Sequence, residues 1–588
     1  MRFFNSFIFS NFVLSTVRTY TAYVSSKKPF HPPILLEDYI PQFRKFMVFV
    51  NLVLFSRLLF IFAKSLSFQS YMFLFEVILI IPIFIIVYKG YINFTSYWDL
   101  KKYVLYTTFF VFLYSINLIF FISDFSSINF SNFWVSASFP TSELGYSYYF
   151  TTEELVKKSL LFDKSLVGSF IFYVDGISLF FILLTTFLTP ICILISWYSI
   201  NEKINFFLIS LVSLEFFLVN AFVVSNLFYF FIFFEAILFP MFFIIGIWGS
   251  RDRKIHAVYQ FLLYTLAGSV FLYVAILLLV FSYDSLDYVI LKHTSIDLFD
   301  QKLIFWLMFI SFAFKIPLFP VHIWLPEAHV EAPTFGSVIL AGLLLKLGTY
   351  GMMRFLIPVL PDAVNYFLPL VLTIVIIGIF YTSFSTTRQL DLKKIIAYSS
   401  VGHMGFVILG LFTTHVEGLV GSLYLMIGHG VVSSALFICV GILYDRYHTR
   451  NVTDLRSLAR FMPLYAIFFL IFTLANVSFP GTFNFIAEVN VLFGLTQINL
   501  LAAVVSIFSI IFIMVYAFWL YNRTMYGTTT AVFDKFFIIG KYMDLSVREF
   551  TVLFIFAFLT LFFGFFPNYI LVFLVPGCEL LNITYDSF

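Results

Sequence analysis

The sequence predicts an all-α polytopic membrane protein, and two observations support this fold class. The chain of 588 residues is 61% hydrophobic and 11% charged, with a mean hydropathy of +1.00, whereas a soluble chain averages about a quarter charged residues. Apolar runs long enough to span a bilayer, about 18 residues or more, recur along most of the chain. The formal net charge of +3 is too small to indicate nucleic-acid binding.

These runs predict about 14–15 transmembrane helices. The approximate spans are 46–63, 71–88, 103–122, 170–197, 204–222, 223–248, 257–281, 303–320, 334–357, 364–385, 393–412, 417–444, 461–495, 498–521 and 548–575. Arg57 interrupts the first run, which leaves the count at 14 or 15. Two helices are predicted to be discontinuous, because 303–320 ends in KIPLFP and 461–495 contains Pro480-Gly481.

Basic and acidic loops alternate along the chain. The basic loops hold Lys89, Lys101, Lys102, Arg251, Arg253, Lys254, Arg388, Lys393, Lys394, Arg446, Arg450, Arg456, Arg460 and Arg523. Acidic residues dominate the loops between them, so loops two crossings apart carry the same sign. By the positive-inside rule the basic side faces a mitochondrial matrix or a bacterial cytoplasm.

An internal repeat is predicted within a transport domain over 166–576. Glu235 precedes Lys315 by nearly as many residues as His403 precedes Glu488, and the second member of each pair lies beside a proline break. The two copies cover about 204–357 and 364–521. Five spans in each copy make the copies inverted in topology, as in many secondary transporters.

The remaining segments of the chain are harder to interpret. Residues 1–165 comprise an extension and the first helices, with a long polar loop at 123–169, and residues 577–588 form a C-terminal tail. Residues 1–36 have no acidic side chain and many Ser and Thr, which resembles a transit peptide, although a retained extension is the interpretation we favour. Three widely spaced cysteines, with no CxxC and no Cys/His cluster, predict neither an iron–sulfur nor a zinc site.

Three isolated charges lie inside apolar runs. Glu235 is in FYFFIFFEAILFPMFFIIGIW, Lys315 in FWLMFISFAFKIPLFP and Lys346 in SVILAGLLLKLGTYG. A charge at the centre of a spanning helix costs roughly 2.5–3.5 kcal/mol, so such residues mark functional sites. The alternatives are a neutral structural carboxyl for Glu235 and a snorkelling side chain for Lys315.

We interpret these residues as members of a proton-transfer chain. A glutamate–lysine pair across two helices stabilises both charged forms, and separating the pair favours the neutral forms, which makes a two-state switch. His322, His403 and His429 are predicted to link the charges, since imidazole exchanges protons near neutral pH. The alternative for each histidine is a core residue with satisfied hydrogen bonds. Glu488, beside the second break, completes the predicted set.

Several blocks resemble a known family. They are FKIPLFPVHIWLPEAHVEAPTFGSVILAGLLLKLGTYGMMRF (314–355), DGISLFFILLTTFLTPICILISW (175–197), FFEAILFPMFFIIGIWG (233–249), DLKKIIAYSSVGHMGFV (391–407), MIGHGVVSSALFICVGILYDRYHTR (426–450) and PGTFNFIAEVNVLFG (480–494). Together they resemble subunit 4 of NADH dehydrogenase in respiratory complex I, the antiporter-like M-subunit type. The resemblance covers about residues 170–575.

The resemblance implies roles for particular residues. It places the family's essential helix glutamate on Glu235, its broken-helix lysine on Lys315 and its central lysine on Lys346. The bridging histidines fall on His403 and His429, and the exit-side glutamate falls on Glu488. Two departures, Gly402 and Ala487, remove no titrating group.

The resemblance also implies a cellular setting. The chain would translocate protons across the mitochondrial inner membrane, with a bacterial plasma membrane as the alternative. NADH oxidation and ubiquinone reduction would occur in other subunits, which would hold the flavin, the iron–sulfur clusters and the quinone, while this chain holds no cofactor. Its partners would be membrane lipids and the antiporter-like subunits 2 and 5. The alternatives are a subunit of a multisubunit cation/proton antiporter and a membrane scaffold.

Overall fold

The computed structural model describes residues 68–92, 97–124, 172–283, 285–529 and 544–582. All of them belong to one compact unit, Leu66–Phe588. Within these ranges the regular elements are helices, joined by three isolated β-bridges. The predicted all-α fold is therefore confirmed. The predicted span 46–63, most of the loop 123–169 and the end of the tail lie outside the described residues.

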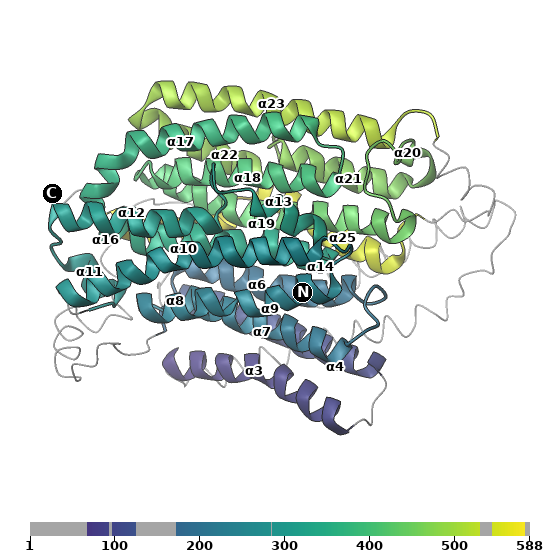
Figure 1. Ribbon diagram of the computed structural model, residues 1–588, viewed down its shortest axis with the longest axis horizontal. Coiled ribbons are helices and arrows are strands. Elements are labelled where there is room, and N and C mark those ends of the chain that lie inside the picture. The colour runs from purple at the N-terminus through teal and green to yellow at the C-terminus, as the bar shows by residue number, and fades with distance from the viewer. Residues whose placement is uncertain (1–67, 93–96, 125–171, 284, 530–543, 583–588) are drawn as a thin grey trace, which may run out of the picture. The chain divides into compact units, whose positions relative to one another are not determined.

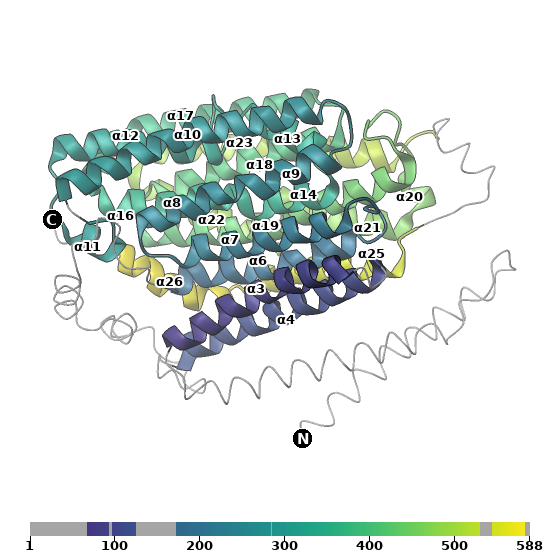
Figure 2. The ribbon, with the colours of Figure 1, turned by 60° about the horizontal axis from the view of Figure 1, so that its bottom comes forward.

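The helices follow one another along the chain in a bundle whose long members lie nearly parallel (Figures 1 and 2). They are α3 (Phe68–Ile92), α4 (Tyr97–Asp124), α6 (Gly176–Ile195), α7 (Ile204–Val223), α8 (Leu227–Ala236), α9 (Leu238–Trp248), α10 (Lys254–Tyr283), α11 (Tyr288–His293), α12 (Leu298–Lys315), α13 (Trp324–Glu331), α14 (Thr334–Ile339), η3 (Leu340–Leu344), α15 (Leu345–Gly351), η4 (Met352–Leu356), α16 (Ile357–Val359), α17 (Pro361–Arg388), α18 (Leu392–Leu411), α19 (Val416–Tyr447), α20 (Leu458–Phe461), α21 (Pro463–Asn476), α22 (Phe483–Ile498), α23 (Leu500–Met525), α25 (Val547–Phe565) and α26 (Asn568–Asn582). Among the described residues, 11 helices are long and apolar enough to cross a membrane, and four shorter apolar helices accompany them.

The first predicted discontinuous helix is confirmed. Helix α12 ends at Lys315 and α13 begins at Trp324. Proline has no backbone N–H, so the prolines between them leave carbonyls of α12 without their helical donors. The indole N–H of Trp324 donates to the Phe314 carbonyl at 2.9 Å and satisfies one of these groups.

The second predicted discontinuous helix is confirmed as well. Helix α21 ends at Asn476 and α22 begins at Phe483. Gly481 lies in the left-handed region at φ +87°, which glycine adopts without steric cost. Its carbonyl oxygen would lie 2.2 Å from a Cβ placed on Gly564 of α25, so that helix packs directly against the break.

One span predicted as continuous is interrupted. The last predicted span divides at Phe566-Pro567 into α25 and α26, because Pro567 cannot continue the ladder of α25. The predicted span 223–248 is one apolar span, Leu227–Trp248, because Ile237 between α8 and α9 keeps right-handed helical backbone. Pro240 removes only the donor to the Ala236 carbonyl, four residues earlier.

The longest helix, α19, lies at the centre of the packing, and its apolar window is entirely buried. The segment Thr334–Val359, which includes the π-helical turns η3 and η4, is buried to the same extent. Helix α22 approaches α19 closely, because a Cβ on Gly428 would lie only 2.6 Å from the Phe483 ring. The two most enclosed segments therefore carry Lys346 and His429.

The helices that precede the predicted transport domain pack against it. The Asn220 amide of α7 donates to the Glu76 carboxylate of α3 at 2.9 Å. Ser115 of α4 and Thr186 of α6 share a hydrogen bond of 2.8 Å. Helices α3 and α4 are thus joined to α6 and α7 by buried polar contacts as well as by apolar packing.

Candidate functional site

Glu235 and Lys315 form an ion pair between α8 and α12. The Lys315 Nζ lies 3.5 Å from the Glu235 Oε1. The same ammonium donates to the Phe234 carbonyl and lies 3.3 Å from the centre of the Phe234 ring. The geometry confirms that the two predicted residues meet, and the role they play in proton transfer stays a prediction.

Helix ends position this pair. Lys315 is the last residue of α12, beside the first break, and Glu235 lies one residue before the end of α8. The lysine side chain is 5% exposed and the glutamate side chain 17%. Lys315 holds the Glu235 carboxylate by charge and by a long hydrogen-bonding contact, and no other donor reaches its oxygens among the described residues. The carboxylate therefore has room for a second partner.

Lys346 lies on α15, directly after η3, and is fully buried. Its Nζ donates to the Ala341 carbonyl at 2.5 Å and lies 2.9 Å from the His429 Nδ1. When Lys346 is an ammonium, it can only donate, so the His429 Nδ1 accepts and the neutral ring carries its proton on Nε2. The contact therefore joins a proton donor directly to a proton acceptor.

The line continues from His429 to Glu488. The rings of His429 and His403 have centroids 5.4 Å apart. The His403 Nδ1 lies 3.3 Å from the Glu488 Oε1, with both side chains almost fully buried. Both ring nitrogens of His403 lack a hydrogen-bond partner among the described residues. Four titratable groups from α15, α19, α18 and α22 thus form one buried line.

This arrangement refines one prediction from the sequence. From their opposite charges, Lys346 and Glu488 are candidates for a second oppositely charged pair, like Glu235 and Lys315. In the structure they are connected through His429 and His403. The second set is therefore a relay of four groups in which the two charged ends are held apart by imidazoles.

His322 is placed away from this line. It lies between α12 and α13 and is buried. Its ring packs on Tyr381 at 5.4 Å and on Phe319 at 5.9 Å between centroids. Among the described residues, no recorded ion pair or hydrogen bond connects it to the other six predicted residues. Its inclusion in the relay stays a prediction that the contacts do not support.

The sequence interpretation missed several buried charged groups. Arg354 pairs with Asp175 at 2.7 Å and lies 4.9 Å from the Tyr173 ring. Glu76 and Glu215 are buried acids on α3 and α7. Each is an isolated charge in an apolar run, the signal that identified Glu235, and it could have found them too.

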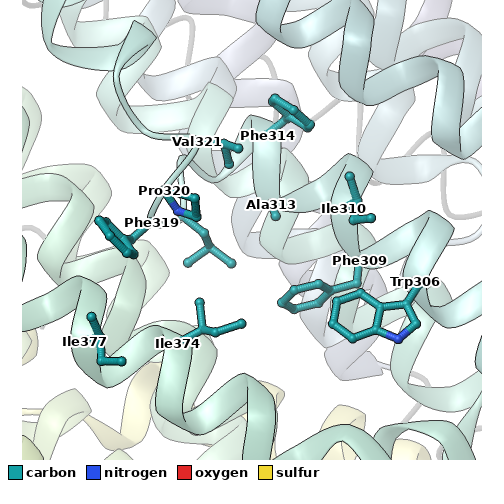
Figure 3. A pocket seen from close by; sticks show the side chains of 11 residues that line it. Trp306, Phe309, Ile310, Ala313, Phe314, Phe319, Pro320, Val321, Ile374 and Ile377 are labelled. Carbon is teal, nitrogen blue, oxygen red and sulfur yellow. The ribbon is translucent and has the colours of Figure 1, made fainter.

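An apolar pocket of about 250 Å³ lies beside the first break (Figure 3). Trp306 and Ile310 of α12, Pro320 of the connection, and Ile374 and Ile377 of α17 are among the side chains that line it. Its lining has no polar surface. The pocket therefore offers nothing that binds or transfers a proton, and the titratable chemistry lies inside the bundle.

Metal ligands do not gather in the described ranges, where no group of three or more His, Cys, Asp or Glu side chains is placed to hold an ion. The three cysteines are buried and unpaired. The buried histidines are arranged along a line with an amine and a carboxylate. This donor set suits proton transfer.

Comparisons with known proteins agree with this geometry. Residues 224–514 match the family described as NADH:quinone oxidoreductase/Mrp antiporter, TM. The NADH-ubiquinone oxidoreductase chain 4 of Acanthamoeba castellanii is 52% identical over 397 residues, which cover 68% of this chain and 79% of the relative. The chain belongs to the NADH-ubiquinone oxidoreductase chain 4 family. The chain 4 of Marchantia polymorpha is 52% identical over 376 residues, covering 64% and 75% of the two chains.

Solved structures show the same fold. A chain of respiratory complex I from Thermus thermophilus superposes with a TM-score of 0.65 and 27% identity, covering 71% of this chain and 90% of that one. A chain of an archaeal membrane-bound sulfane sulfur reductase has a TM-score of 0.73 at 18% identity, covering 88% and 99%, and shares the fold. As a chain 4 family member, the protein is a membrane subunit of NADH-ubiquinone oxidoreductase, which confirms the predicted family, fold and enzyme.

Proposed function

We propose that this subunit carries protons along the line Lys346–His429–His403–Glu488, with Glu235 and Lys315 as the switch that feeds it. The observation that carries the proposal is the buried series formed by the Lys346–His429 hydrogen bond, the His429–His403 ring contact and the His403–Glu488 ion pair. Each of these four side chains can bind and release a proton without forming or breaking any other bond, and each is buried inside the bundle.

The contacts suggest an order of transfer. The Lys346 ammonium gives a proton to the His429 Nδ1, and the imidazolium releases its other proton from Nε2. His403 takes this proton and passes it to the Glu488 carboxylate, 3.3 Å from its Nδ1. The line is ready for another proton at Lys346 once Glu488 has released its proton and each imidazole has returned to its starting tautomer. The imidazoles serve as carriers because each accepts at one nitrogen and releases at the other.

The Glu235–Lys315 pair controls loading of the line. While the pair is closed, each charge is stabilised by the other at 3.5 Å. Opening the pair removes that stabilisation and favours transfer of a proton from the amine. The helix breaks beside Lys315 and Glu488 supply backbone that can shift without disturbing a full spanning helix.

The predicted domain organisation enters the proposal unchanged. The transport domain is 166–576, between the N-terminal segment 1–165 and the tail 577–588. The inverted copies are 204–357 and 364–521. Support comes from the two breaks, since each copy contains one discontinuous helix with an ionisable residue beside it.

The setting of the subunit is also proposed here. The subunit lies in the mitochondrial inner membrane with its basic loops toward the matrix, and antiporter-like subunits 2 and 5 flank it. NADH oxidation and quinone reduction in other subunits drive the switch, so this chain needs no redox cofactor. The charge alternation of the loops and the chain 4 relatives support this setting.

Lys346→Met tests the proposal. The purified complex that carries the substitution is reconstituted into vesicles, and NADH-driven acidification is measured with a pH-sensitive dye. We expect acidification to fall by roughly a hundredfold, the scale on which a positioned proton donor acts. Lys102→Met is the matched control, because Lys102 is 51% exposed on α4. Acidification that is unchanged in both variants would contradict the proposal.

A further inference from the structure

Glu215 is a buried acid on α7 that the relay above does not use. Its side chain is 1% exposed, and Thr189 of α6 is the one hydroxyl that acts on the carboxyl group, without a hydrogen bond of normal geometry to either oxygen among the described residues. It lies next to Thr189 and Cys192 of α6. A buried carboxylate without such support is costly, so its presence requires a partner charge or a proton.

Helix α7 runs parallel to the segment that carries Lys346. The rings of Phe207 and Phe335 have centroids 4.7 Å apart. At the other end, the Tyr350 hydroxyl donates to the Phe222 carbonyl at 2.9 Å. The two members of each pair are the same distance apart along the chain, 128 residues. The helices therefore keep one register over this length.

This register places Glu215 at the depth of the Lys346 ammonium. Adding the same offset puts Glu215 level with Leu343. That level lies between Lys346 and Ala341, whose carbonyl accepts from the Lys346 Nζ. The acid and the amine therefore lie at one level of the bundle, on helices that touch, since α7 contacts α15.

The side chain also lies on the appropriate face of α7. Phe207, Leu211, Glu215, Leu218 and Phe222 recur at intervals of three and four residues, which places them in one stripe along a helix. The two phenylalanines at the ends of this stripe make the contacts described above. Glu215 therefore faces the Lys346 segment, whereas its neighbour Asn220 faces α3 through Glu76.

The two charges complement each other. Among the described residues, Lys346 forms no ion pair with a carboxylate. The polar contacts of the Lys346 ammonium are the Ala341 carbonyl and His429. Cys192 on α6 lies near Glu215, and Glu76 lies beyond Asn220 on another face of α7. Lys346 is the buried cation that the shared register places at the depth of Glu215.

We propose that Glu215 is a further proton-transfer residue, which reloads Lys346 from α7. The neutral carboxylic acid breaks its O–H bond and the neutral amine forms a new N–H bond, which leaves a carboxylate and an ammonium. The ammonium then gives a proton to the His429 Nδ1. The inference rests on the proposed relay and adds a second supply to it beside the Glu235–Lys315 pair.

The test compares Glu215→Gln with Glu215→Asp in the purified complex, reconstituted into vesicles and driven by NADH. Glutamine keeps the size and hydrogen-bonding capacity but cannot lose a proton, whereas aspartate keeps the titrating group. We expect a roughly tenfold slower acidification for Glu215→Gln and a substantial recovery for Glu215→Asp. A purely structural role predicts the reverse order, because aspartate leaves the larger gap.

Controls separate this inference from the relay itself. Glu76→Gln, at the other buried acid, should keep the native rate. If Lys346→Met abolishes acidification and Glu215→Gln keeps the native rate, the relay stands and the inference about Glu215 is wrong. If Lys346→Met also keeps it, the proposed function fails. If Glu215→Gln prevents assembly of the complex, the acidification rate of Glu215→Asp decides instead. Its control is Glu76→Asp, in which the side chain of the other buried acid is shortened by the same amount. A Glu215→Asp rate below that of the assembled Glu76→Asp complex contradicts the inference.

Discussion

Replacing Glu235 with glutamine and Lys315 with methionine, singly and together, tests whether the pair works as one unit. The two charges are 3.5 Å apart. At an effective dielectric constant of about 20, this separation corresponds to an attraction of roughly 5 kcal/mol before desolvation. Desolvation offsets much of it, and couplings between contacting residues reach about 3 kcal/mol.

We therefore expect each single substitution to slow NADH-driven proton uptake roughly a hundredfold, about 2.7 kcal/mol. The double variant should be no slower than either single variant, because removing one member already disables the switch. The initial rates of vesicle acidification are measured for the native complex, the two single variants and the double variant, which together make a double-mutant cycle. A double variant slowed by the product of the two single effects would refute the pairing, since it would mean that the residues act independently.

Two further predictions concern packing and pH. In Gly428→Val the new Cβ would lie 2.6 Å from the Phe483 ring. We therefore expect α22 to move away from α19, which lowers the stability of the complex by about 1–3 kcal/mol. The measurement is the thermal midpoint of the assembled complex, and Gly402→Ala is the control because the nearest atom to its new Cβ is 3.5 Å away. Burial lowers the pKa of Lys292, which lies on α11 outside the spanning helices, to about 8. Between about pH 8 and 10.5 the lysine is therefore protonated in the unfolded chain and mostly neutral in the folded chain. The free energy of unfolding consequently rises with pH across that window. Lys292→Met should therefore raise the midpoint at pH 7, and the gain should shrink toward pH 10. An equal gain at both values would contradict the assignment.

Sequence patterns were informative wherever a polar group interrupts an apolar run. Glu235, Lys315 and Lys346 stand out because nothing else in their segments is charged. Proline predicted the break between α12 and α13 and the break between α21 and α22. The same rule applied to Pro567 would have predicted the division at Phe566, and the cost of burying a charge would have identified Glu215.

The contacts between helices could not be predicted from the sequence. His429 is 83 residues from Lys346 along the chain, and only the packing of α19 against the Lys346 segment shows that the two touch. Opposite charge suggested a direct pairing of Lys346 with Glu488, because a sequence shows which residues share a helix face and not which helices meet. The π-helical turns around Lys346 also cannot be recognised from hydrophobic periodicity, since the whole segment is buried on every side.

His322 shows the limit of interpreting histidines from composition. Unlike His403 and His429, it has no flanking Gly or Ser, and its position beside a break suggested a link. In the structure its ring is surrounded by aromatic side chains of the connection and of α17 and α18. Whether a buried histidine is a carrier or a packing residue depends on these neighbours, which come from other helices.

The most direct test of the account is the number of protons taken up per NADH oxidised by a complex that carries Glu488→Gln. Both quantities are measured on the same vesicles, with the native complex and Lys102→Met as references. The account predicts that proton uptake per NADH falls, because the terminal acceptor of the line, 3.3 Å from His403, can no longer take a proton. Uptake per NADH equal to that of the native complex would contradict the central claim that protons pass along this line.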